Sequence, residues 1–292
     1  MITAERLTAA TLRLGEGPVA LGDDRFACVD IRTGTVYEGD LAGRLEAIGR
    51  FDDTVGAIAP TSTGDLVVAR RQSVELLSRV ERRIDLPPQS PEIRLNDGKA
   101  DPDGRFVVGT MAEPVATGAG ALWSFADGAA TALVDRVTIS NGLAWSADGR
   151  RLFYVDTPTH RIDEFAYGGD GSIGARSTHV ALSESLGDPD GMTIDRSGGL
   201  WVAMWGGNAV IGVRDGQVVE RIEVPARFVT CATFIGHDLR TLVITTAGEP
   251  DGTGAADGAI YVAEMPVAGS LPHQVDERAT FGDESANTLP SP

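Results

Sequence analysis

The chain has 292 residues, of which 42% are apolar and 23% are charged, so it is long enough to form a globular protein with a large core. Its 42 Asp and Glu residues outnumber 25 Lys and Arg residues, which gives a formal net charge of −17. Such an acidic chain is a poor candidate for binding nucleic acid or an anionic membrane surface. No apolar run approaches the roughly 20 residues of a membrane span.

Residues 1–14 have neither the basic start nor the apolar centre of a signal peptide. The two cysteines, Cys28 and Cys231, stand in unrelated contexts, which excludes a disulfide framework and a zinc–cysteine motif. We therefore expect a cytoplasmic protein. The 36 glycines and the lack of a long segment with helical periodicity favour an all-β fold.

Six short apolar runs, each preceded by a turn, are predicted strands. In chain order they are Arg25–Asp30, Asp65–Ala69, Arg105–Gly109, Leu152–Asp156, Leu200–Met204 and Leu242–Thr246. Their first large apolar residues are 40, 40, 47, 47 and 42 residues apart. A period in the forties is typical of β-propellers, and a β-sandwich with coincidental spacing is the alternative. We predict a single six-bladed β-propeller domain over residues 1–281, followed by a polar, frayed tail over residues 282–292.

Equivalent positions in the blades of a propeller face a common axis. Ten to twelve residues before the reference position of each run, the sequence has Glu16, Gly56, Asn96, Asn141, Asp190 and Thr230. Four of these six side chains carry a carboxylate or a carboxamide. Oxygen donors without His or Cys suit a divalent cation. Because Asn-Gly and Asp-Gly are also common in turns, each position taken alone could be a turn residue.

Five segments of the sequence resemble the SMP-30/gluconolactonase/regucalcin family. They are LGEGP (14–18), RLNDGKADPDGRFVVGTM (94–111), ISNGLAWS (139–146), DPDGMTID (188–195) and GGLWVAMWGG (198–207). The resemblance extends over residues 16–246 and implies a six-bladed propeller. By the same resemblance, Glu16, Asn141 and Asp190 match the metal ligands of the family, and Asp190 also matches its catalytic base.

The resemblance also implies substrate contacts. Arg94 and Asn96 match the substrate-contacting residues of the family's R-x-N-D-G-K block. Some members continue GTM with A-E-E, and their second Glu contacts the substrate. This chain has Pro114 at that position, which leaves Glu113 as the candidate replacement. From the residues alone, Arg94 could instead form a salt bridge with Glu92 or Asp97.

The implied activity is metal-dependent hydrolysis of a sugar-acid lactone, an aldonolactone, to the free sugar acid. A divalent cation on the axis would polarise the lactone carbonyl and activate water. Oxygen ligands and the family resemblance leave its identity open among calcium, zinc, manganese, magnesium and iron(II). The expected partner is therefore a small sugar lactone, and the expected protein is a monomer or a small homo-oligomer.

Two other functions fit the same pattern of residues. One is another ester-type hydrolase that acts on an apolar lactone or an organophosphate. The other is a non-catalytic, calcium-binding regulatory propeller, which would not need Arg94 and Asn96.

The sequence also predicts the surroundings of two further residues. Lys99, the chain's only lysine, is interpreted as a partner for turn carbonyls or carboxylates, and Trp205 is a candidate for the mouth of the pocket.

Overall fold

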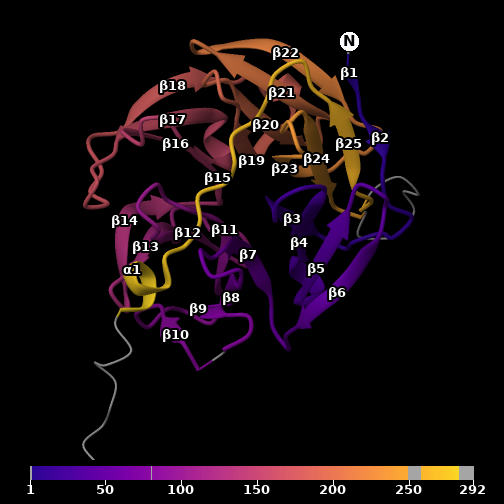
Figure 1. Cartoon of the computed structure of the whole chain (residues 1–292). Coiled ribbons are helices and arrows are strands. Elements are labelled where there is room, and N and C mark those ends of the chain that lie inside the picture. Colours follow the sequence, from indigo (N-terminus) through magenta and orange to yellow (C-terminus); the bar gives the residue numbers. More distant parts are fainter. Residues whose placement is uncertain (1, 80, 249–257, 283–292) are drawn as a thin grey trace, which may run out of the picture.

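The computed structural model describes residues 2–79, 81–248 and 258–282, and it places six β-sheets in a ring (Figure 1). Their strands pair antiparallel, except for one short N-terminal strand. Blade 1 contains β3 (Gly15–Ala20), β4 (Arg25–Asp30), β5 (Thr35–Asp40) and β6 (Leu45–Arg50). Blade 2 contains β7 (Val55–Pro60), β8 (Leu66–Arg70), β9 (Ser73–Leu76) and β10 (Arg83–Asp85). Blade 3 contains β11 (Ile93–Ala100), β12 (Phe106–Ala112), β13 (Gly120–Ala126) and β14 (Ala129–Val137).

The second half of the ring repeats this order. Blade 4 contains β15 (Ser140–Trp145), β16 (Arg151–Asp156), β17 (Arg161–Ala166) and β18 (Ser177–Ala181). Blade 5 contains β19 (Asp188–Ile194), β20 (Leu200–Trp205), β21 (Ala209–Arg214) and β22 (Gln217–Glu223). Blade 6 contains β23 (Val229–Ile235), β24 (Thr241–Thr246) and β25 (Tyr261–Glu264). The predicted six-bladed β-propeller is therefore confirmed, and the six predicted strands are the second strands of the blades.

Two short N-terminal strands close the ring. β2 (Glu5–Arg6) pairs antiparallel with β25 and becomes the outermost strand of blade 6. β1 (Ile2–Thr3) pairs in parallel with β22 of blade 5. The start of the chain thus joins its last two blades, a contact that the repeat pattern did not predict.

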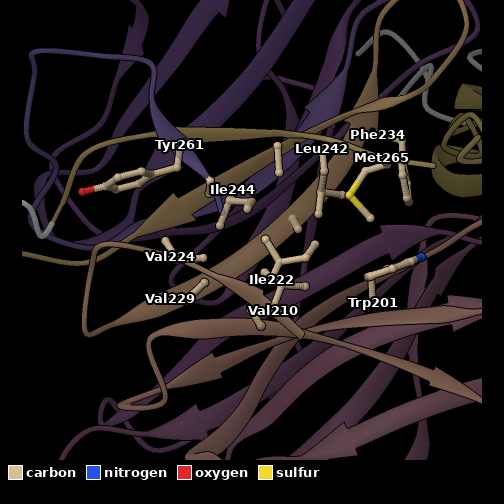
Figure 2. Close-up of a cluster of buried hydrophobic side chains, with 14 of the residues drawn as sticks. Trp201, Val210, Ile222, Val224, Val229, Phe234, Leu242, Ile244, Tyr261 and Met265 are labelled. Carbon is tan, nitrogen blue, oxygen red and sulfur yellow. The ribbon is translucent and has the colours of Figure 1, made fainter. Parts of the chain in front are cut away.

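Apolar side chains fill the spaces between neighbouring blades. Figure 2 shows one such cluster, in which Trp201 and Ile222 of blade 5 meet Phe234 and Tyr261 of blade 6. The rings of Trp201 and Phe234 meet edge to face with their centroids 6.5 Å apart. Contacts of this kind hold each blade at a fixed angle to the next, and they therefore fix the positions of the inner strands around the axis.

Short helical turns follow some of the strands. They are η1 (Ile31–Thr33), η2 (Thr157–Thr159) and η3 (Glu184–Leu186). Residues 265–276, the C-terminal strap, cross the ring from β25 to helix α1 (Glu277–Phe281), which lies beside blade 3 (Figure 1). In the described part of the chain, no helix is long and apolar enough to cross a membrane. Residues 283–292 of the predicted tail lie outside the described residues, and the domain boundary at 281 stays a prediction.

Candidate active site

The first strand of every blade lies nearest the axis, and its pairing with the second strand shifts register once. The shifts fall at residues 16–19, 55–57, 95–98, 140–143, 189–192 and 229–231. Such a shift is a β-bulge, which re-aims a side chain away from the regular ladder. The six equivalent positions predicted from the sequence lie in or beside these bulges, so the same local irregularity presents each of them.

Blades 2 and 6 use the equivalent position differently from the other four. At Gly56, a Cβ atom would come within 2.5 Å of the carbonyl oxygens of Leu95 and Asn96, so only glycine lets β7 pass β11 this closely. Thr230 is fully buried, and its hydroxyl donates to the carbonyl oxygen of Gly15 at 2.6 Å. These two positions serve packing, and the oxygen donors come from blades 1, 3, 4 and 5.

Hydrogen bonds fix the orientation of the two carboxamides. Asn96 Nδ2 donates to Asn141 Oδ1 at 3.0 Å and to the carbonyl oxygen of Ser140 at 2.8 Å. Arg94 Nη1 donates to Asn96 Oδ1 at 2.7 Å, and Asn141 Nδ2 donates to Thr157 Oγ1 at 2.8 Å. The amide oxygen of Asn141 is therefore directed toward Asn96 and keeps a lone pair for a further partner.

Three carboxyl groups are buried near the axis. Glu16, Asp97 and Asp190 are each no more than 6% exposed. Burial and the neighbouring Asp97 raise the pKa of Glu16 to about 8. Burial, followed by the charges of Glu16 and Asp97, raises the pKa of Asp190 well above its usual value. Without a cation, the protein therefore disfavours the ionised forms of Glu16 and Asp190.

Five of the six predicted site residues line one cavity of about 230 Å³. These are Glu16, Arg94, Asn96, Asn141 and Asp190. Apolar side chains complete part of its wall, namely Leu14, Ile31, Met111, Ile139 and Trp205. The Trp205 ring, a candidate from the sequence, packs on Phe228 with the ring centroids 4.5 Å apart. The cavity therefore combines oxygen donors and an arginine with an apolar wall.

Glu113 does not line the cavity, but it contacts the arginine that does. Arg94 Nε lies 3.4 Å from Glu113 Oε2, and Arg32 Nη1 forms an ion pair with Glu113 Oε1. Among the described residues, Arg94 pairs with neither Glu92 nor Asp97, so the salt bridge considered from the sequence is wrong in its partner. Burial lowers the pKa of Arg94 to about 10, a value at which the guanidinium is still charged at neutral pH.

Some residues in or beside the cavity were not singled out from the sequence, although Asp188 begins the quoted DPDGMTID segment. Arg32 and Thr157 reach it from η1 and η2, which are single short turns without periodicity. Asp188 also lines it, and its carboxylate lies 3.3 Å from His160 Nε2. Asp97 belongs to the quoted NDGK block, and its Oδ2 atom is buried without a hydrogen-bond partner in the described structure. The motif alone did not indicate that the side chain of Asp97 is buried.

The residues present fit a divalent cation that prefers oxygen. Glu16 and Asp190 supply two carboxylates whose pKa values are raised by burial and by neighbouring carboxylates, a shift that a bound cation would oppose, and Asn141 supplies an amide oxygen. The described residues contain no group of three or more His, Cys, Asp or Glu side chains able to hold a metal. The donor set of two carboxylates and one amide is not a group of that kind.

The comparisons with known proteins identify the family. The model of the SMP-30/gluconolactonase/LRE-like region matches residues 14–248. The chain belongs to this family. The match covers the inner strands of all six blades, including every residue of the candidate site.

Relatives and solved structures agree with this assignment. The chain is 34% identical to a putative sugar lactone lactonase, YvrE, of Bacillus subtilis, over 81% of this chain and 84% of that protein. It is 32% identical to the pentonolactonase XacC of Haloferax volcanii, over 95% and 99% of the two chains. The structure of regucalcin from Agrobacterium tumefaciens, described as a calcium-binding protein, superposes with a TM-score of 0.87 at 26% identity and covers 94% of this family member and 98% of that chain.

Proposed function

We propose that this family member is a lactonase that hydrolyses lactones of sugar acids and uses a divalent cation bound on the propeller axis. The observation that carries the proposal is the cavity that joins Glu16, Asn141 and Asp190 to Arg94 and Asn96. Relatives named as lactonases that match nearly the whole chain support it further. The first group of residues suits a cation, and the second suits a substrate rich in hydroxyl groups.

Glu16, Asn141 and Asp190 would hold the cation. When bound, it would polarise the lactone carbonyl and make a nearby water more acidic. Asp190 would accept the proton of the attacking water. The water oxygen would bond to the carbonyl carbon, and the bond from that carbon to the ring oxygen would break. Asp190 would return its proton to the ring oxygen, which leaves as a hydroxyl group.

The other residues would place the lactone. Arg94 lines the cavity and its guanidinium can only donate hydrogen bonds, so it would bind substrate hydroxyls and the carboxylate of the product. Asn96 would donate and accept, and it also keeps Asn141 oriented. Trp205 would cover the apolar C–H face of the sugar ring. Glu113 would act through Arg94 by holding its guanidinium in place.

The test uses metal-stripped protein and a panel of five- and six-membered aldonolactones. Calcium, magnesium, manganese, zinc and iron(II) are added back singly, and hydrolysis is followed by acid release. We expect one or more metals to restore turnover. We expect Asp190→Asn to lower kcat by about 10³-fold, as the loss of a base typically does. Asp23→Asn is the matched control, because it makes the same chemical change at an exposed turn position.

A second candidate function is supported by the apolar part of the cavity wall. Five apolar side chains line the cavity, and they would suit an apolar lactone or an organophosphate ester. The panel therefore includes an alkyl γ-lactone and a dialkyl phosphate ester. Preference for these compounds would replace the sugar-lactone proposal. Tight cation binding without any turnover would instead favour a calcium-binding regulatory role. The identity of the metal, a cytoplasmic location and a monomeric or small homo-oligomeric state stay predictions.

A further inference from the structure

A second cavity of about 240 Å³ lies at the other end of the inner strands. It shares no lining residue with the candidate active site. Its walls come from the later residues of β3, β7, β11, β15, β19 and β23, and residues 270–273 of the C-terminal strap cover it. Figure 1 shows the strap crossing this region of the ring. We call this space the strap cavity.

The wall of the strap cavity is largely apolar. Val19, Ile58, Leu143 and Ile194 come from four different blades, and Leu271 comes from the strap. Val19, Ile58 and Leu143 are almost completely buried, whereas Leu271 is 61% exposed. A ligand with an apolar body would gain free energy by burying its own apolar surface against these side chains.

The polar groups of this wall include two donors with unused capacity. Lys99 Nζ donates to the carbonyl oxygen of Met192 at 2.5 Å, which leaves two ammonium protons for other acceptors. Trp145 is 3% exposed, and its Nε1 is buried without a hydrogen-bond partner in the described structure. A buried, unsatisfied N–H is costly, and an incoming acceptor removes that cost.

The carboxylate in this wall is engaged elsewhere. Asp195 lines the cavity, but its Oδ1 accepts from the backbone N–H groups of Ser197 and Gly199. Its Oδ2 accepts from Trp201 Nε1 at 2.9 Å and from Arg214 Nη2 at 2.6 Å. Among the described residues, the wall therefore offers Lys99 and Trp145 no free carboxylate, and a ligand with a negatively charged acceptor would match the ammonium group.

We propose that the strap cavity binds a small monocarboxylate with a compact apolar body, about the size of benzoate. The carboxylate accepts hydrogen bonds from Lys99 and Trp145, and the apolar body packs against the inner strands beneath Leu271. This proposal does not depend on the lactonase activity, because the two cavities have separate walls.

The test follows the four tryptophan indole N–H signals in ¹⁵N-tryptophan-labelled, full-length protein. They are assigned with Trp→Phe variants, and benzoate is then titrated. Trp145 lines the strap cavity, and Trp205 lines the candidate active site. We expect a saturable downfield shift of the Trp145 signal while the Trp205 signal stays in place. A response of Trp205 alone would place benzoate in the candidate active site, and no response would leave the strap cavity without this ligand. Either result overturns the proposal.

Two control ligands and two variants sharpen the test. Acetate has the charge without the apolar body, and benzyl alcohol has the body without the charge, so both should bind more weakly than benzoate. Trp145→Phe keeps the aromatic packing and should weaken benzoate binding about tenfold, measured by calorimetry. Lys99→Met should abolish the preference for benzoate over benzyl alcohol. Melting curves check that each variant is folded, and unchanged benzoate affinity in both folded variants would refute the assigned contacts.

Discussion

A substitution at Arg94 can distinguish substrate binding from cation binding. Arg94 lines the candidate active site and is 3% exposed, while the proposed cation ligands belong to other residues. We expect Arg94→Met to lower kcat/KM for the best lactone by about 10²-fold, the value of two lost hydrogen bonds to a charged group. Cation affinity, measured by calorimetry, should change less than about threefold. An equal loss of cation affinity would show that Arg94 supports the metal site instead.

Substitution of Glu113 tests the role of Arg94 through its ion-pair partner. Its carboxylate is shared by Arg32 and Arg94, so Glu113→Gln removes a charge without removing a donor from the cavity. We expect KM to rise several-fold, with kcat changed less, because Arg94 loses its fixed position. A fall in kcat without a change in KM would give Glu113 a direct part in the chemistry.

Asp195 gives a prediction for stability against pH. Burial raises the pKa of its carboxyl, but hydrogen bonds from Ser197, Trp201 and Gly199 outweigh burial and hold the pKa below its usual value of 3.8. The stabilisation is thus present above the unfolded pKa and is lost as the pH falls through the folded one. Asp195→Asn should cost about 2 kcal/mol in urea unfolding at pH 7, and the difference from the wild type should shrink between pH 5 and pH 3. A pH-independent difference would contradict this explanation.

At the scale of the elements, two blades share a device that fixes the start of the inner strand. Asp30, at the end of β4, accepts from the backbone N–H groups of Arg13 and Leu14, just before Glu16. Asp156, at the end of β16, accepts from Thr138 and from Ile139 at 2.9 Å, just before Asn141. Each carboxylate therefore holds the backbone that leads into a proposed cation ligand.

These two aspartates are positioning residues, and their replacement should weaken cation binding. We expect Asp30→Asn and Asp156→Asn each to weaken cation affinity about tenfold, as loss of support for a metal ligand commonly does. Calorimetric titration measures the effect, and Asp23→Asn is the exposed control. If both variants melt at lower temperature but bind the cation as tightly as the wild type, the aspartates stabilise the blades without positioning the ligands.

The sequence predicted the repeated parts of this molecule and missed the unrepeated ones. An offset of ten to twelve residues from the second strands located Glu16, Asn96, Asn141 and Asp190, because every blade places a bulge at a similar point of its first strand. Arg32 reaches the cavity from a single turn that has no periodicity. The partner of Arg94 was wrong because Glu113 is nineteen residues away in the chain and adjacent only through the pairing of β11 with β12.

At the scale of the whole molecule, the ring has one seam, where blade 6 meets blade 1. The N-terminal strands hold one side of it, since β2 extends blade 6 and the chain then continues into β3 of blade 1. The backbone N–H of Leu7 donates to the carbonyl oxygen of Ile260 at 2.8 Å, and Thr8 Oγ1 accepts from the N–H of Ile260 at 3.1 Å. Across the seam, Thr230 Oγ1 donates to Gly15 O at 2.6 Å, directly beside Glu16.

Deletion of residues 1–8 should therefore affect the candidate site although no deleted residue lines it. We expect the melting temperature to fall by about 10 °C or more, because strand pairs and the contacts of residue 7 and residue 8 with blade 6 are lost together. Cation affinity should fall with it, since Glu16 belongs to blade 1, next to the lost contacts, while Asn141 and Asp190 belong to blades 4 and 5.

Thr230→Val is a milder test of the same seam, because it removes one hydrogen bond there and keeps the side-chain shape. It should lower stability by about 1 kcal/mol and weaken cation binding by a smaller factor than the deletion. If the deletion lowers the melting temperature but leaves cation affinity intact at a temperature where the protein is folded, then the contacts between blades fix Glu16 without the N-terminal strands.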